Sequence, residues 1–196
     1  MDALQNYYKN SLLNHLCSEY KDIWQSCHND KEKLMELVLQ RQSLPHFMTY
    51  AYEGIGVTKE YAKEQFAEYI NGNRVFYDVD GVNGNYASGM YIDFEEDKQA
   101  IITLDTCAIL WCKDMEILVP ITKCPVFYIS NNSNVNISMD GYSSIVIYLF
   151  DDSNVTIVDA DESCNVTIFK YSKNAGVEVG KYCLAQIKEF DKELRI

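Results

Sequence analysis

Short stretches of alternating apolar and polar residues recur through the C-terminal half of the chain. Five such blocks lie between residues 133 and 179, and Asp, Asn, Ser or Gly separates each block from the next. Their first apolar residues follow at steps of 10 or 11 and are Val135, Ile145, Val155, Val166 and Val177. A strand this short cannot bury its apolar row alone and must stack on a neighbour. The pattern predicts a β-solenoid.

Weaker alternating pairs extend this pattern upstream. They are Ile101/Thr103, Ile109/Trp111, Ile117/Val119 and Phe127/Ile129. Adding them gives nine strand segments, which we expect to form coils of two or three strands over residues 99–196. The tail mixes Leu184, Ile187 and Phe190 with many charged residues. Charge at the end of a solenoid disfavours further stacking, so we expect the tail to be a charged cap.

The first part of the chain has a helical period instead. Apolar residues recur at three- and four-residue steps up to about residue 70, with Asp30 and Thr58 placed as N-caps. We expect a small helical bundle over residues 1–73 that covers one end of the solenoid. Turn-prone Asp80-Gly81 and Asn83-Gly84 predict a hairpin connector over residues 74–98. The predicted fold class is therefore α+β: an N-terminal small helical bundle followed by a short single-chain β-solenoid with a charged C-terminal cap.

Composition narrows the range of partners. The 196 residues include 29 acidic and 17 basic ones, for a net charge of −12. Such a chain is poorly suited to neutralising phosphates, so we expect no nucleic acid partner. No apolar run is long enough to span a membrane and the N-terminus lacks the apolar core of a secretory signal, so we expect synthesis in the host cytoplasm and no membrane partner. The seven cysteines show no CxxC spacing and are expected to be buried reduced thiols.

An acidic cluster is the main candidate for chemistry. It comprises Asp151, Asp152, Asp159, Asp161 and Glu162. If the coils stack in register, Asp152 and Glu162 occupy equivalent turns one repeat apart. Such carboxylates could bind Ca²⁺ or act as an acid and base on a glycan, but Asp also makes good solenoid corners. We prefer the corner interpretation and keep four of these acids as surface binding candidates together with three tyrosines: Asp152, Asp159, Asp161, Glu162, Tyr142, Tyr148 and Tyr171.

Catalytic motifs are missing from the sequence. It contains no GxSxG, P-loop, GxGxxG, HExxH or EF-hand pattern, and its three histidines, His15, His28 and His46, have no metal or triad spacing. The period of 10 or 11 also differs from the six-residue period of hexapeptide acyltransferases. We therefore predict no enzyme activity, no catalytic residue, no metal and no cofactor.

Two segments carry a family resemblance, namely LPHFMTYAYEGIGVTKEYAKEQFAEYING (44–72) and TKCPVFYISNNSNVNISMDGYSSIVIYLFDDSNVTI (122–157). Here the chain resembles uncharacterised proteins encoded by phages and prophages of gut Bacteroidales. The resemblance implies a phage gene product, with no activity or site residues attached. We expect a non-enzymatic structural or binding protein, such as a virion component of a tail, fibre or capsid, with protein partners and a homo-oligomer left open. The alternatives are a glycan-binding or glycan-cleaving β-helix and an acidic cytoplasmic inhibitor of a host protein.

Overall fold

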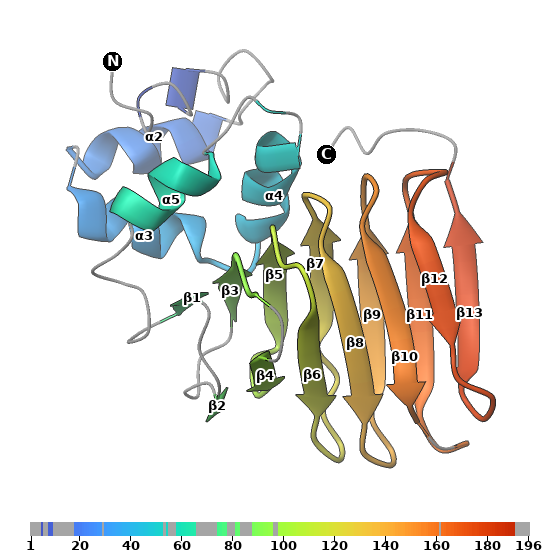
Figure 1. The fold of residues 1–196 in the computed structure, drawn as a ribbon. Coiled ribbons are helices and arrows are strands. Elements are labelled where there is room, and N and C mark those ends of the chain that lie inside the picture. The colour runs from blue at the N-terminus through green and yellow to red at the C-terminus, as the bar shows by residue number, and fades with distance from the viewer. Residues whose placement is uncertain are drawn as a thin grey trace.

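Strands that alternate between two parallel sheets form the larger part of the protein (Figure 1). The computed structural model describes residues 5, 8–9, 18–28, 30–52, 54, 58–65, 74–77, 81–82, 88–95, 98–160 and 162–190. Sheet A contains, in spatial order, β1 (Val75–Tyr77), β3 (Ser88–Ile92), β5 (Thr106–Leu110), β7 (Val126–Ser130), β9 (Ser144–Leu149), β11 (Asn165–Lys170) and β13 (Leu184–Glu189). Sheet B contains β2 (Gly81–Val82), β4 (Lys98–Ile101), β6 (Met115–Val119), β8 (Asn134–Met139), β10 (Asn154–Asp159) and β12 (Gly176–Val179).

Each coil of this solenoid uses two strands, one in each sheet. Consecutive strands of the chain therefore lie in opposite sheets, and stacked neighbours come from alternate strands. Asn154 pairs with Asn134 in sheet B, and Asn165 pairs with Ser144 in sheet A. The predicted β-solenoid is confirmed, and the step of 10 or 11 residues corresponds to half a coil.

The apolar residues of the repeats meet between the two sheets. One inward row of sheet A runs in register through Cys107, Phe127, Ile147 and Ile168, and all four are fully buried. Inward residues of sheet B, such as Ile137, complete the same cluster. Stacking lets each five- or six-residue strand share a core that it could not form alone.

The solenoid begins earlier and ends later than the sequence predicted. Strand β1 pairs with β3 in parallel, with Val75 opposite Met90, so the hairpin predicted over residues 74–98 is wrong. Turn-prone Asp-Gly and Asn-Gly pairs are typical of solenoid corners as well as of hairpins, and the alternation pattern does not distinguish the two. Strand β13 is a further solenoid strand in the segment expected to form the charged cap, and residues 191–196 of that predicted cap lie outside the described residues.

Four helices of the described residues precede the strands: α2 (Ser18–Ser26), α3 (Lys31–Val38), α4 (Leu44–Tyr52) and α5 (Lys59–Gln65). The side chain of Asp30 accepts a hydrogen bond from the backbone of Lys33, and Thr58 Oγ1 accepts one from the backbone of Tyr61. Both predicted N-caps are therefore present. They satisfy amide groups that the first helical turn leaves without intrahelical partners.

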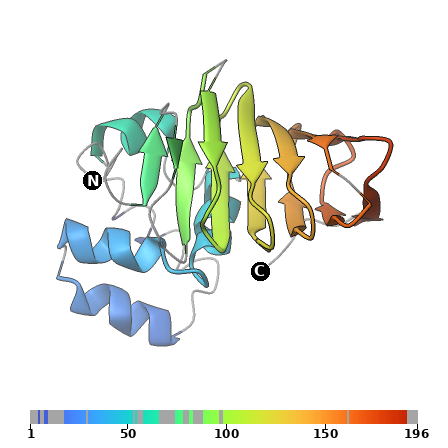
Figure 2. The same cartoon turned by 90° about the horizontal axis from the view of Figure 1, so that it is seen from below.

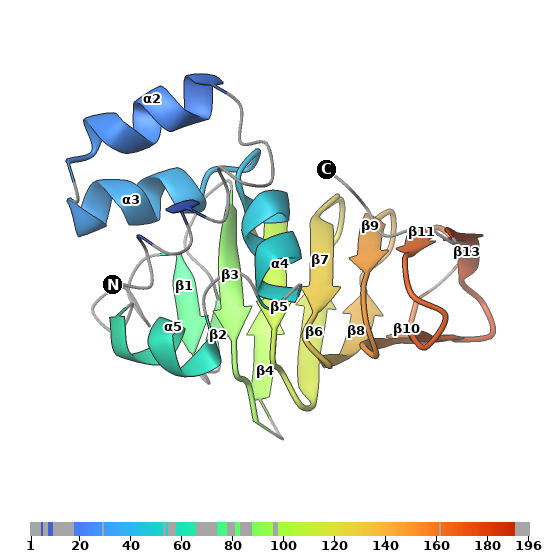
Figure 3. The ribbon, with the colours of Figure 1, turned by 90° about the horizontal axis from the view of Figure 1, so that it is seen from above.

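Helices α3 and α4 pack against the outward face of sheet A over β3 and β5 (Figure 3). Apolar residues of α3 and α4, such as Val38 and Phe47, share one buried cluster with Met90, Ala108 and Leu110 of the strands. The prediction of a self-contained bundle that caps the solenoid is thus not confirmed. Strands β3 and β5 are buried along their whole length because they are covered on both faces.

Four corners that follow strands of sheet A share one backbone conformation. Asp93, Trp111 and Asn131 come directly after β3, β5 and β7, Asp151 comes two residues after the end of β9, and all four have φ between 46° and 59°. Asp and Asn tolerate this left-handed region better than most residues do. This backbone conformation therefore explains why Asp and Asn recur between the blocks.

Candidate functional site

The two outward faces of the solenoid differ in chemistry. Along sheet B, one outward row carries Glu116, Asn136, Thr156 and Glu178 in register. Along sheet A, the residues of one outward row are apolar or aromatic from Val75 to Phe169, and Lys188 ends this row. Helices cover them over β3 and β5, but β9, β11 and β13 extend past the described helices (Figure 1). The uncovered part of sheet A is therefore the leading candidate for an interaction surface.

Six stacked side chains occupy this part of sheet A, and we call them the aromatic ladder: Tyr128, Tyr148, Phe150, Phe169, Tyr171 and Phe190. Tyr128, Tyr148 and Phe169 lie in register on β7, β9 and β11. Their ring centroids are 4.9 Å and 5.0 Å apart, close to the spacing of strands in a sheet. A second row stacks Phe150 on Tyr171 at 5.4 Å and Tyr171 on Phe190 at 5.0 Å.

Stacking decides which parts of the rings a partner can reach. Both faces of Tyr148 are occupied by its neighbours Tyr128 and Phe169. A sugar that stacks on an aromatic residue needs a free ring face, so this arrangement disfavours Tyr148 as a glycan platform. The ladder instead presents ring edges, which carry partial positive charge. Burial raises the pKa of Tyr128 and of Tyr171, so both keep their hydroxyl protons at neutral pH.

Basic side chains lie close to the aromatic ladder, although the chain as a whole is acidic. The Lys188 ammonium lies 5.2 Å from the ring centroid of Phe169. The charge of Arg41, just after α3, acts on Tyr128 and partly opposes the rise in its pKa. The ladder thus combines apolar area, hydroxyl donors and positive charge.

The residues selected from the sequence do not form one site. Tyr148 and Tyr171 belong to the aromatic ladder. Asp152 lies at the corner between β9 and β10, whereas Tyr142 and Glu162 lie at corners on the opposite edge of the solenoid. Asp159 ends β10, and Asp161 lies outside the described residues.

Stacking of Asp152 on Glu162 was predicted wrongly. Two strands complete a coil, so turns one repeat apart alternate between the two edges. The Asp152 carboxylate instead accepts a hydrogen bond from Asn174 Nδ2 at 2.9 Å, one coil along the same edge. Asp151 accepts from the backbone of Asn131 and Asn132 in the preceding coil. These contacts are those of corner residues.

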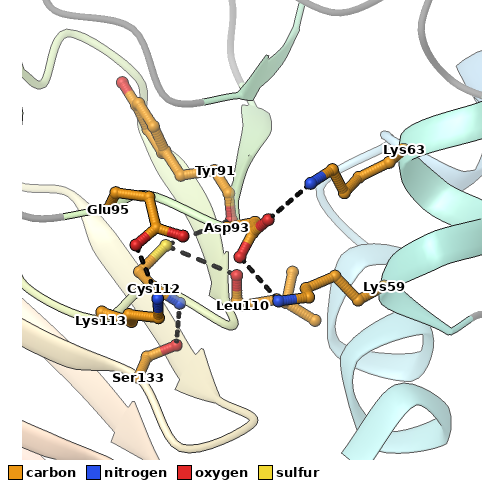
Figure 4. A network of polar contacts seen from close by, with 9 residues as sticks. All are labelled: Lys59, Lys63, Tyr91, Asp93, Glu95, Leu110, Cys112, Lys113 and Ser133. Carbon is orange, nitrogen blue, oxygen red and sulfur yellow. Dashed lines mark hydrogen bonds and ion pairs between the residues drawn. The ribbon is translucent and has the colours of Figure 1, made fainter.

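A buried carboxylate that the sequence did not single out joins the helices to the solenoid (Figure 4). The side chain of Asp93 is 4% exposed and forms ion pairs with Lys59 Nζ at 2.9 Å and Lys63 Nζ at 3.0 Å. Both lysines belong to α5, which they attach to the first corners of sheet A. The two lysines hold the pKa of Asp93 below its ordinary value although burial alone would raise it.

Asp93→Asn is expected to lower the free energy of unfolding by about 1–2 kcal/mol at neutral pH, because it removes both ion pairs. Asparagine also tolerates the positive φ, so backbone strain contributes little. The lowered pKa means that this contribution is present above the ordinary value of 3.8 and is lost as pH falls through the folded-state value. Urea unfolding of both proteins at about pH 7 and about pH 2.5 should show the difference shrink on acidification.

Glu95→Gln is the matched control for Asp93→Asn, because Glu95 pairs with Lys113 at an exposed position nearby. We expect Glu95→Gln to change the free energy of unfolding little. The role given to Asp93 would be contradicted if both variants lost the same free energy of unfolding. It would also be contradicted if the difference in unfolding free energy between wild type and Asp93→Asn persisted in acid.

Thiols near this carboxylate are suited to packing. Cys107 and Cys112 are fully buried, and burial raises the pKa of the Cys112 thiol to about 12. Cys27 and Cys164 are buried as well, as expected, whereas Cys124 is exposed and Cys183 is half-buried, so the prediction of buried thiols is wrong for Cys124. Within the described residues, no group of three or more His, Cys, Asp or Glu side chains is arranged to hold a metal ion.

None of the described helices is long and apolar enough to cross a membrane. No family model, no curated protein and no solved structure matches the chain.

Proposed function

We propose that this chain is a non-enzymatic structural or binding protein that presents the outward face of sheet A to a protein partner. The aromatic ladder is the observation that carries the proposal. It continues the apolar rows that the helices cover on β3 and β5, and it extends them past α4 to β13. The outward row of sheet B that passes through Asn136 and Thr156 is polar by contrast.

One outward row of side chains runs in register from the helix-covered strands of sheet A to the uncovered ones, and this continuity supports the proposal. Val75, Met90, Ala108, Tyr128 and Tyr148 form a single outward row along sheet A. Helices bury the first three side chains of the row, whereas Tyr148 is only half-buried. A partner that extends the helical layer would contact the same row. Aromatic residues of this kind are enriched at protein interfaces, since their rings cover area with few rotatable bonds.

The phage context of the proposal rests on the sequence resemblance. In that context the partner is another virion protein, and the chain is a component of a tail, fibre or capsid. The stiff stacked coils suit such a role because each coil is fixed by its neighbours. An inhibitor of a host protein would use the same face with a different partner, and the experiment below distinguishes the two.

A photoreactive benzoyl-phenylalanine at Tyr148 is expected to form a covalent adduct with the partner. The ladder faces the partner, and the para position is the ring atom farthest from the sheet. The same residue at Thr156, on the polar face of sheet B, is the control and should give no adduct. Cells that produce the phage would be irradiated, and adducts identified by mass spectrometry in purified particles and in the lysate.

Each result of this experiment has a clear meaning. An adduct between the Tyr148 variant and a particle protein supports the virion role. An adduct with a host protein, together with absence of the chain from particles, favours the inhibitor. Equal adducts at both positions, or none at Tyr148, would contradict the role proposed for the ladder.

A further inference from the structure

The last strand of sheet A has an edge that no described strand occupies. Strand β13 pairs with β11 in parallel from Asn165 opposite Leu184 to Lys170 opposite Glu189. Sheet A ends at β13, and Figure 2 shows this coil at the far end from the helices. A strand edge carries a row of backbone donors and acceptors that can pair with another strand.

Exposed apolar side chains lie on this strand and directly after it. Leu184 is 65%, Ile187 47% and Phe190 42% exposed. Ile187 occupies the inward row in which Ile168 and Ile147 are fully buried, so it is a core residue without a covering coil among the described residues. This end of the solenoid therefore exposes apolar strand residues of the kind that the next coil covers elsewhere in the stack.

We propose that β13 pairs antiparallel with β13 of a second copy of the chain, about a twofold axis at Ile187. In this register Ile187 faces Ile187 of the second copy, Leu184 faces Phe190, and Gln186 faces Lys188. Residues opposite each other then belong to the same face of the sheet. No like charges are opposed, whereas a shift that moves the axis to Lys188 would place two lysines face to face.

The pairing extends both existing rows of side chains. Phe190 stacks on Tyr171 through one face, with ring centroids 5.0 Å apart. Leu184 of the second copy would cover the opposite face and so continue the aromatic ladder. On the inward side, the two Ile187 side chains would meet at the end of the row that passes through Ile168.

Charged residues of β13 do not oppose this arrangement. Glu189 is paired with Lys170 at 3.4 Å, and Lys188 lies over the ring of Phe169. Within one chain, Glu189 thus has a basic partner and Lys188 an aromatic one. Neither needs to lose a partner when the second copy binds.

A closed dimer fits better than a filament. A head-to-tail filament would have to pair β13 with the other edge of sheet A, where β1 spans only Val75–Tyr77. A twofold contact uses the six-residue strand β13 from both copies. Such an isologous interface closes on itself, because it uses the β13 edge of both copies.

Light scattering after size exclusion tests the proposal on the full chain. We expect a mass of about twice the 22.6 kDa of the chain at ~100 µM. Ile187→Lys should raise the dimer Kd by about 100-fold or more, because two lysines would meet at the axis. Val158→Lys is the matched control, since Val158 is a similarly exposed apolar residue on sheet B, and it should remain dimeric.

Cysteine cross-linking tests the register independently of any loss of folding. In a Cys124→Ser, Cys183→Ser background, Ile187→Cys should form an intermolecular disulfide on mild oxidation, since residues opposite each other have Cβ atoms about 4.5–5.5 Å apart. Neither the background protein nor the same background with Thr156→Cys should cross-link. A wild-type monomer, a dimer that survives Ile187→Lys or dissociates with Val158→Lys, or no cross-link at residue 187 would each overturn the proposal.

Discussion

Phe127→Ala is expected to lower the free energy of unfolding by about 3–5 kcal/mol, because it removes a ring from the centre of a packed stack. Phe127 is fully buried between the two sheets, in register with Cys107 on one side and Ile147 on the other. The coils above and below are hydrogen-bonded to it through β5 and β9, so they cannot collapse into the space without breaking their own pairing. The cavity therefore stays largely open.

Urea unfolding followed by circular dichroism measures this effect. Tyr142→Ala is the control, since Tyr142 is 75% exposed at a corner, and its free energy of unfolding should change little. The accessibility of the Cys107 thiol provides a local readout, because a cavity beside it should speed its labelling in the folded protein. A loss below about 1 kcal/mol for Phe127→Ala would mean that the inward row does not carry the stability of the coil.

The solenoid could be predicted from the sequence because each strand repeats a local pattern. The number of strands in a coil could also have been recognised. Ser133-Asn134 and Ser153-Asn154 are 20 residues apart and stack directly, whereas the intervening block belongs to the other sheet. The Ser-Asn pair therefore repeats with the full coil, while the apolar pairs repeat with half of it.

Packing of the helices on sheet A was harder to predict. A signal is present in Met90-Tyr91-Ile92 and in Cys107-Ala108-Ile109-Leu110, which are continuous apolar runs and are typical of strands covered on both faces. Sequence reasoning assigned the first run to a hairpin and so missed it. No local signal marks Asp93, because its role depends on lysines of α5 that reach it only after the helix docks.

The aromatic ladder was found in part. Tyr148 and Tyr171 were selected as exposed tyrosines, but their stacking depends on the register of β9 and β11, which composition does not reveal. The acidic cluster was selected for its density along the chain. Consecutive strands lie in opposite sheets, so consecutive corners lie on opposite edges of the solenoid. The acidic residues are therefore close in sequence but separated in space.

Asp151→Ala is expected to lower the free energy of unfolding by about 2–4 kcal/mol, from two separate causes. The first cause is conformational, because Asp151 has φ 46° and alanine disfavours that region. The second is the loss of an acceptor. The carboxylate accepts from Ser153 N at 2.9 Å, Ser153 Oγ at 2.6 Å and Asn132 N at 3.2 Å, and also from the backbone of Asn131.

Three substitutions at this position separate the two causes. Asp151→Gly removes the acceptor without backbone strain and should be less damaging than Asp151→Ala by about 1 kcal/mol. Asp151→Asn keeps one acceptor oxygen and tolerates the positive φ, so it should be the mildest. Asp152→Ala is the matched control, because Asp152 is exposed, has no positive φ and should cost little. Equal losses in the three Asp151 variants would contradict the conformational argument.

Acidification should act on Asp151 and Asp93 in opposite directions. Burial raises the pKa of Asp151 above its ordinary value of 3.8, so the folded protein binds the proton more tightly than the unfolded chain does. Its carboxyl therefore contributes more stability as pH falls through the folded-state pKa. The difference between wild type and Asp151→Asn should widen from about pH 7 to about pH 3, while the difference for Asp93→Asn narrows on further acidification. If the loss of unfolding free energy changed with pH in the same way for both variants, the opposite pKa shifts assigned to Asp151 and Asp93 would be contradicted.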